Sequence, residues 1–323
     1  MPIGEFELIR RFFTRPPRRF DVVQGVGDDC ALLKPQKGNC LAITTDTLVE
    51  GVHFLSGTHP ESLGHKVLAV SLSDLAAMGA TPAWVSLALT LPSADENWLA
   101  AFSGGFAALA DQYGVELVGG DTTRGPLSIT VQAIGFVAEE GALRRSSARW
   151  GDGIYLTGDL GLAGLGLEIL LGKSTQHAPS AVSKLERPQP RVNEGISLAG
   201  FANACIDISD GLAADLSHIL RESGVGAMLD WTALPLPSAV RQYIESGGDQ
   251  WMPLRAGDDY ELCFTVSAER EIELVSRMAE FGCSCVRIGH IEQQLGLRLR
   301  HDGIVFDLAE LGYQHFSSES QQL

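Results

Sequence analysis

Apolar positions in the first half of this chain alternate between two spacings. A repeat of three to four positions, which predicts helices, occurs in residues 5–13, 63–78 and 96–113. Apolar runs typical of strands occur in residues 40–43, 84–91, 115–118 and 128–137. Gly79 stops the second predicted helix. This alternation predicts an α/β domain in which helices stack on a sheet.

The pattern is interrupted near residues 144–151, where the composition turns polar and basic, and it then starts again. We expect further strands at residues 154–156, 204–206 and 261–266, and further helices that end at residue 171 and span residues 212–223. The sequence thus predicts an α/β fold with two domains, at residues 1–147 and 148–316, followed by a disordered polar tail at residues 317–323.

The composition narrows the class of protein. The chain has 323 residues, of which 45% are apolar and 20% charged, and this is ordinary for an α/β protein with sizeable cores. A net charge of −16, without a stripe of Lys and Arg, argues against a nucleic-acid partner. The first residues lack a signal-peptide pattern, and no apolar stretch is long enough to cross a bilayer. We therefore expect a cytoplasmic protein with buried, reduced cysteines.

Carboxylates beside small or hydroxyl-bearing residues recur where apolar runs end. The five segments are Gly27-Asp28-Asp29, Thr44-Thr45-Asp46, Ser73-Asp74, Gly119-Gly120-Asp121 and Asp207-Ile208-Ser209-Asp210. Burying such groups without a partner costs several kcal/mol, and lysines that would mark a solvated face are missing around them. Each segment alone also suits a turn or a helix cap. Together they favour hard oxygen ligands for several Mg²⁺ ions that hold a polyphosphate.

Other candidate motifs are weaker. The glycines at positions 158, 161, 164 and 166 do not have the spacing of a dinucleotide-binding loop, and we interpret them as a tight turn with close packing. Gly172-Lys173-Ser174 ends a predicted helix, so it is not a Walker loop. Arg144 and Arg145 suit either a phosphate contact or a basic linker. His53 suits either a substrate phosphate or a structural role.

The acidic segments, in this order, resemble the thiamine-monophosphate kinase family, within the superfamily of aminoimidazole ribonucleotide synthetase. The matching stretches are GVGDDCA (25–31), TTDTLVEGVHF (44–54), VSLSDLAAMGA (70–80), GGDTTRG (119–125), IDISDGL (206–212) and DYEL (259–262). They extend over nearly the whole chain. The second and last stretches separate this kinase from its superfamily relatives.

The resemblance implies roles for individual residues. The residues that would hold Mg²⁺ are Asp29, Thr44, Thr45, Asp46, Asp74, Asp121, Asp207 and Asp210. ATP would contact Gly120, Asp121, Arg145 and Ser209. His53 and Asp258 would contact thiamine monophosphate, although the family usually has the longer Glu where this chain has Asp258. The family also implies a homodimer in which the N-terminal sheets form a shared barrel.

The activity that the resemblance implies is transfer of the γ-phosphoryl group of ATP to thiamine monophosphate, which gives thiamine diphosphate and ADP. The acceptor is already an anionic phosphate, so charge neutralisation and in-line placement matter more than a general base, and none is assigned. Two alternatives stay open. One is another ligase or kinase of the superfamily with a different acceptor, and the other is a nucleotide-binding regulatory module without turnover.

Overall fold

The computed structural model describes residues 4–308, which divide into two compact units. The N-terminal unit comprises residues 4–75 and 81–139, and the C-terminal unit comprises residues 76–80 with the described part of 140–320. The expected tail at residues 317–323 lies outside the described residues. Within residues 4–308, no helix combines the length and the apolar character needed to cross a membrane.

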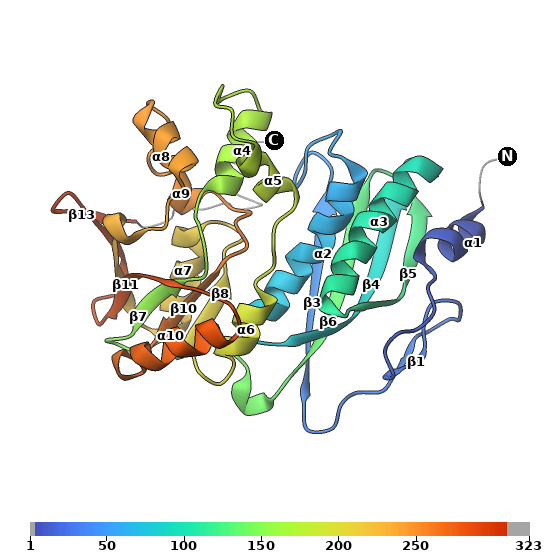
Figure 1. Ribbon diagram of the computed structural model, residues 1–323, viewed down its shortest axis with the longest axis horizontal. Coiled ribbons are helices and arrows are strands. Elements are labelled where there is room, and N and C mark those ends of the chain that lie inside the picture. Colours follow the sequence, from blue (N-terminus) through green and yellow to red (C-terminus); the bar gives the residue numbers. More distant parts are fainter. Residues whose placement is uncertain (1–3, 309–323) are drawn as a thin grey trace. The chain divides into compact units, whose positions relative to one another are not determined.

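A four-stranded sheet is the centre of the N-terminal unit. Its elements are α1 (Glu5–Leu8), the π-helical turn η1 (Ile9–Phe13), β1 (Val22–Gln24), β2 (Leu32–Leu33), β3 (Cys40–Val49), α2 (Pro60–Ala77), β4 (Thr81–Leu91), α3 (Glu96–Tyr113), β5 (Glu116–Arg124) and β6 (Ser128–Val137). The strand order is β3-β6-β4-β5, in which only β4 and β5 run parallel. The helices α2 and α3 lie side by side over one face of this sheet (Figure 1).

Two glycines bring α2 and α3 into close contact. A Cβ atom added at Gly64 would lie 2.0 Å from the carbonyl oxygen of Phe102, and one at Gly105 would lie 2.0 Å from that of Glu61. Only residues without a side chain allow the helix backbones to approach so closely. On the other face of the sheet, the ring of Trp84 packs against Phe136 and donates its indole N–H to Asp21.

Strands β3 and β5 are longer than the sequence predicts. Thr44, Thr45 and Asp46 were expected at a strand end, but β3 continues past them to Val49 because β6 pairs with it in register along all ten residues. The Gly119-Gly120-Asp121 segment likewise lies inside β5, paired with β4. A partner strand of full length supplies the hydrogen bonds that extend each strand, and a local pattern does not contain that information.

The C-terminal unit is built on a mixed sheet of seven strands with the order β13-β12-β9-β11-β7-β10-β8. Its strands are β7 (Gly153–Leu156), β8 (Ala204–Asp207), β9 (Gly226–Asp230), β10 (Leu262–Val266), β11 (Val286–Glu292), β12 (Gly296–His301) and β13 (Ile304–Asp307). Its α-helices are α4 (Leu162–Leu170), α5 (Pro179–Glu186), α6 (Val192–Leu198), α7 (Leu212–Ser223), α8 (Ser238–Glu245), α9 (Met252–Arg255) and α10 (Glu271–Glu280). Short 3₁₀ turns are η2 (Glu139–Gly141), η3 (Arg145–Ser147), η4 (Trp231–Ala233) and η5 (Ala268–Arg270).

The main core of this unit lies between the sheet and α7. Leu216 and Ile219 of α7 belong to one buried cluster with Ile154 of β7 and Ile206 of β8. The glycine-rich stretch packs tightly, as the sequence predicts, since a Cβ atom at Gly166 would lie 2.3 Å from the carbonyl oxygen of Ala181. The apolar face of the sheet is therefore covered by α7. The polar segments at the ends of the strands are the candidates for a functional site.

The six cysteines are all free thiols, but they are not all buried. Cys205 and Cys263 are buried in β8 and β10, as expected. Cys30 and Cys40 are exposed, so the expectation of burial is wrong for these two. Cys40 is the first residue of the edge strand β3, which has a neighbouring strand on one side only.

Candidate functional site

In the N-terminal unit, oxygen ligands from β3 and α2 meet. Thr44 and Asp46 are two positions apart on β3 and therefore point to the same face. The hydroxyl of Thr44 donates a hydrogen bond to Asp74 Oδ2, and Ser71 Oγ donates to Asp46 Oδ2 at 2.7 Å. The structure thus joins three of the expected metal ligands and adds Ser71, which the sequence did not single out.

The electrostatics of this cluster favour a cation. Burial, followed by the negative charge of Asp74, raises the pKa of Asp46 to about 6, although the bond from Ser71 acts in the opposite direction. Two carboxylates that repel each other in a half-buried place are stabilised by a positive charge between them. The donors are all oxygen, which suits Mg²⁺.

Three other expected ligands lie apart from this cluster. Thr45 points to the opposite face of β3, where its hydroxyl accepts a bond from Gln132 Nε2 at 3.4 Å. Asp121 is exposed on β5 and, by the sheet register, shares that opposite face. Asp29 is exposed between β1 and β2, and no hydrogen bond among the described residues joins it to Asp46.

Gly120 lies one residue before Asp121 where β5 passes close to β4. A Cβ atom at Gly120 would lie only 1.8 Å from the carbonyl oxygen of Leu87. The position therefore requires glycine, and the exposed backbone beside it is open to a phosphate group. An exposed glycine backbone of this kind suits the expected ATP contact.

His53 lies in the turn that follows β3. Its Nδ1 accepts the backbone N–H of Val49 at 3.0 Å, and its own backbone N–H donates to the carbonyl oxygen of Val49 at 3.0 Å. When the ring is neutral, its proton therefore resides on Nε2. An Nε2–H group is a suitable donor to a phosphate oxygen.

In the C-terminal unit, three expected site residues and a further carboxylate, Asp215, lie between the end of β8 and the first turn of α7. Asp207 ends β8, and Ser209 and Asp210 follow it. Asp215, in the first turn of α7, accepts the backbone N–H groups of Ser209 (2.9 Å) and Asp210 (3.0 Å) with its Oδ2. Burial, followed by the charges of Asp207 and Asp210, raises the pKa of Asp215 to about 8.

Sequence reasoning missed Asp215, although a signal was present. An acidic residue within the first turn after Gly211 is a typical feature of a helix N-terminus, where the helix dipole favours negative charge. That signal marks a cap and does not reveal which backbone groups the carboxylate binds.

The segment that contains Asp258 packs directly on this loop. The backbone N–H of Asp258 donates to the carbonyl oxygen of Ser209 at 2.9 Å, and the Tyr260 hydroxyl donates to Asp258 Oδ1 at 2.8 Å. Asp258 and Tyr260 both have positive φ values, 66° and 47°. Such strained backbone in residues other than glycine is typical of functional sites. The structure therefore brings together Ser209 and Asp258, which the sequence assigned to different ligands.

The remaining acidic residues of the DYEL stretch are buried and structural. Asp259 accepts the N–H groups of Gly161 (2.8 Å) and Ala163 (3.3 Å) at the start of α4. Glu261 is bound by Lys184 (2.5 Å) and by Arg191, through its Nε (2.5 Å) and Nη2 (2.7 Å). These two carboxylates anchor α4, α5 and the start of α6 to the edge of the sheet near the Asp258 segment.

Arg145 is exposed in η3, and its charge and that of Asp210 both act on His218. Burial and the charges of Arg221 and Arg145 lower the pKa of His218, whereas the charge of Asp210 raises it. The carbonyl oxygen of Arg145 accepts a bond from Ser223 Oγ at 2.9 Å, which holds η3 on α7. The Arg145 guanidinium and the Asp210 carboxylate are thus both close enough to His218 for their charges to act on it.

Residues 27–137 match the family described as AIR synthase related protein, N-terminal domain, and residues 149–302 match the corresponding C-terminal domain. The thiamine-monophosphate kinase of Salmonella typhimurium strain LT2 is 45% identical over 98% of this chain and 100% of that protein. This chain belongs to the thiamine-monophosphate kinase family. The corresponding kinase of Escherichia coli strain K12 is also 45% identical, with the same coverage.

Solved structures of thiamine-monophosphate kinases have the same fold. The kinase from Stenotrophomonas maltophilia K279a has a TM-score of 0.83 and 45% identity over 88% of this chain and 92% of that chain. AaThiL complexed with AMPPCP and TMP has a TM-score of 0.77 and 32% identity over 87% of this chain and 89% of that chain. The family and the two-domain α/β fold class expected from the sequence are therefore confirmed.

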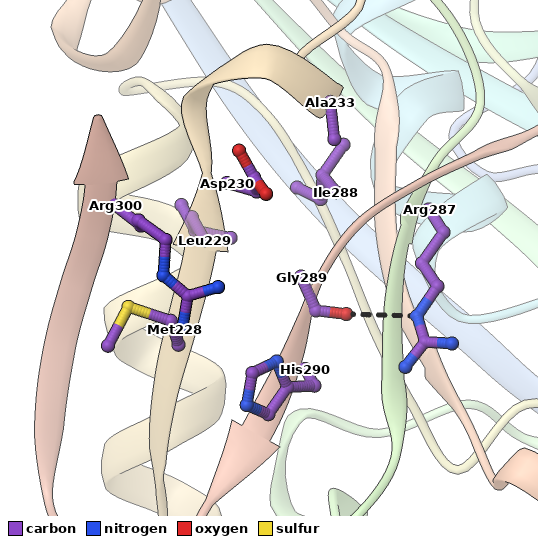
Figure 2. A pocket seen from close by; sticks show the side chains of 9 residues that line it. All are labelled: Met228, Leu229, Asp230, Ala233, Arg287, Ile288, Gly289, His290 and Arg300. Carbon is purple, nitrogen blue, oxygen red and sulfur yellow. Dashed lines mark hydrogen bonds between the residues drawn. The ribbon is translucent and has the colours of Figure 1, made fainter. Parts of the chain in front are cut away.

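The C-terminal unit also has a surface cavity of about 260 Å³ (Figure 2). Its lining includes Arg287, His290 and Arg300. The Arg287 guanidinium is 2.8 Å from Glu271 Oε1, and His290 Nε2 is 3.3 Å from Glu292 Oε1. The positive charge of Arg287 is therefore balanced by Glu271. The described lining residues include none of the expected site residues.

Proposed function

We propose that this chain is an ATP-dependent kinase that transfers the γ-phosphoryl group to the phosphate of thiamine monophosphate, giving thiamine diphosphate and ADP. The observation that carries this proposal is 45% identity to thiamine-monophosphate kinases over 98% of the chain. The AMPPCP and TMP in the AaThiL complex support ATP and thiamine monophosphate as the two substrates.

The oxygen donors of β3 and α2 fit Mg²⁺. Residues 4–308 contain no group of three or more His, Cys, Asp or Glu side chains already arranged as a metal site. Mg²⁺ commonly takes only one or two carboxylates and completes its shell with water and substrate phosphates, so the Asp46–Asp74 pair suffices for one ion. When bound, Mg²⁺ would neutralise charge on the phosphates. The proposed ligands are Asp29, Thr44, Thr45, Asp46, Asp74, Asp121, Asp207 and Asp210.

The chain's own residues bind and orient the two substrates. Gly120, Asp121, Arg145 and Ser209 are proposed to contact ATP. His53 and Asp258 are proposed to contact thiamine monophosphate, His53 through its Nε2–H group. Because the acceptor is an anion, the protein's task is to place two repelling phosphates in line, and no residue is assigned as a general base.

We also propose a cytoplasmic homodimer. Six free cysteines suit a reducing compartment. On the edge strand β3, Leu41 and Ile43 are 42% and 58% exposed, and they share the sheet face that α2 does not cover. Exposed apolar side chains on an edge strand favour pairing with another sheet, as in a barrel shared by two N-terminal domains. The N-terminal domain (1–147) would thus combine dimerisation with ATP and Mg²⁺ binding, and the C-terminal domain is assigned to residues 148–316.

The test is an assay of purified chain with ATP, MgCl₂ and thiamine monophosphate, in which thiamine diphosphate and ADP are measured separately. Equal amounts of both products support the proposal. ADP with a different phosphorylated acceptor would favour another kinase of the superfamily, and no ADP with any acceptor would favour a regulatory module.

The same assay tests the metal cluster. Asp46→Asn keeps the size of the side chain and removes its charge. Turnover should therefore fall about a hundredfold or more, which corresponds to a rise of at least ~2.7 kcal/mol in the activation barrier. Asp302→Asn, which alters an exposed carboxylate of the C-terminal unit, is the control. Unchanged turnover of Asp46→Asn at limiting MgCl₂ would contradict the assignment.

A further inference from the structure

The segment from Ile208 to Gly211 is held on one side by a buried carboxylate. Asp215 is 3% exposed and accepts the N–H groups of both Ser209 and Asp210 with the same oxygen. Its own backbone N–H donates to the carbonyl oxygen of Gly211 at 3.0 Å. Two successive N–H groups that converge on one oxygen fix the backbone direction at both residues.

The other side of the same segment is held by residues 257–260. The carbonyl oxygen of Ser209 accepts the N–H of Asp258 (2.9 Å), and that of Ile208 accepts the N–H of Tyr260 (2.8 Å). Gly257 permits this contact, because a Cβ atom there would lie 2.1 Å from the carbonyl oxygen of Ser209. The backbone of Ser209 is therefore bonded through its N–H to Asp215 and through its C=O to Asp258.

We propose that Asp215 is a positioning residue for both substrates: it fixes the peptide of Ser209 and Asp210, and through the carbonyl of Ser209 it also fixes Asp258. This inference rests on the proposed function and deepens it. Asp215 contacts no substrate in this proposal. It acts because displacement of a binding group by about 1 Å can cost on the order of a hundredfold in rate.

A purely structural role is the competing explanation. A carboxylate in the first turn of a helix also stabilises that helix through its dipole. The two roles differ in what they predict, since a cap affects the stability of α7, whereas a positioning residue also affects the binding constants of ATP and of thiamine monophosphate.

The experiment compares steady-state kinetics and thermal unfolding of the full chain with ATP, MgCl₂ and thiamine monophosphate. Asp215→Ala should lower kcat/KM about tenfold or more for each substrate. Asp215→Asn should recover most of this loss, because its amide oxygen can accept both N–H groups. Tyr260→Phe removes the hydroxyl bond to Asp258 and should raise KM for thiamine monophosphate while KM for ATP changes less than twofold.

Asp230→Ala is the matched control. Asp230 Oδ1 also accepts two hydrogen bonds at the start of a short helical turn, from the N–H and the hydroxyl of Thr232. The Asp230→Ala substitution should lower the midpoint of thermal unfolding and leave kcat/KM for both substrates unchanged. If Asp215→Ala behaves like Asp230→Ala, Asp215 is only a cap and the inference is overturned.

If Asp215→Ala does not fold, Asp215→Glu replaces it. That variant keeps a carboxyl group in the first turn of α7 but extends it by one methylene, so the same loss of kcat/KM is expected, and wild-type constants would overturn the inference. Wild-type chain that forms no thiamine diphosphate would instead contradict the proposed function, so the two failures are distinguishable.

Discussion

Thr45 and Asp46 are neighbours in the chain and lie on opposite faces of β3. Asp46 faces α2, where it meets Ser71 and lies close enough to Asp74 for the two charges to interact. Thr45 faces the other side, with Gln132. Strand alternation alone produces this separation, so a metal site that uses both residues needs contributions beyond the Asp46–Asp74 cluster. Whether a residue of β3 can bind the same metal ion as Asp46 therefore depends on the face of the strand on which it lies.

At the same scale, Arg145 is expected to distinguish ATP from the acceptor. A forked guanidinium pairs well with phosphate oxygens, so Arg145→Ala should weaken ATP binding about tenfold or more and leave thiamine monophosphate binding nearly unchanged. Calorimetric titration with AMPPCP and with thiamine monophosphate measures both affinities. Arg149→Ala, also exposed and only four positions away, is the control. Unchanged AMPPCP affinity in Arg145→Ala would assign this residue to a basic linker.

Asp259 should make the stability of the fold depend on pH. Burial raises the pKa of its carboxyl to about 7 from an ordinary value of 3.8. Between these values the folded chain binds a proton that the unfolded chain releases, so the contribution of Asp259 to stability is lost as the pH rises through this window. The fall in the unfolding midpoint from about pH 4 to about pH 8 should be smaller in Asp259→Asn than in wild type. Asp302→Asn should keep the wild-type slope, and equal slopes in all three proteins would contradict this account.

At the scale of elements, the crossing of α2 and α3 depends on glycine at defined positions. Gly104 and Gly105 are adjacent on α3, yet a Cβ atom at Gly104 meets nothing within 4 Å, whereas one at Gly105 would lie 2.0 Å from the carbonyl oxygen of Glu61. The same helix α2 carries Ser71 and Asp74 further along its length. Helix geometry alone does not reveal which of the two glycines faces the other helix.

The two glycines make a matched pair of substitutions. Gly105→Ala should lower the free energy of unfolding by about 1–3 kcal/mol, because the helices must move apart. Gly104→Ala should raise it by about 0.5–1 kcal/mol, because alanine has the higher helix propensity. Urea unfolding followed by circular dichroism gives both values. Equal effects of the two substitutions would show that the close crossing is wrong.

At the scale of the whole molecule, the exposed apolar side chains of Leu41 and Ile43 on β3 predict the oligomeric state. Light scattering coupled to size exclusion should give twice the chain mass of 34.6 kDa. Ile43→Asp places a charge on the exposed face of β3 and should shift the mass to that of one chain, since burial of an unpaired carboxylate is costly. Val275→Asp, on the 69% exposed side chain of Val275 in α10, should leave the mass unchanged. A single-chain mass for wild type would contradict the dimer.

The sequence by itself determined the family, the alternation of helices and strands in the N-terminal unit and several boundaries. It did not predict β9 and β11 to β13 or the helices α5, α6, α8, α9 and α10. The helices Glu96–Tyr113 and Leu212–Ser223 and the strand Ser128–Val137 have the predicted bounds. The helix ends are local signals, because Gly114 and Gly224 adopt the left-handed conformation that stops a helix. The acidic segments were recognisable for the same reason, as each is a short run of neighbouring residues.

Only the tertiary structure decided on which face of a strand these residues lie and which groups they bind. Register with β6 extended β3 through Asp46, so that strand alternation applies to Thr45 and Asp46. Folding also brought Asp258 onto Ser209 from 49 positions later in the chain. It placed the buried carboxylates of Asp215 and Asp259 on particular N–H groups. Strand register and contacts between distant segments depend on the packing of the entire unit, so no local pattern of residues contains them.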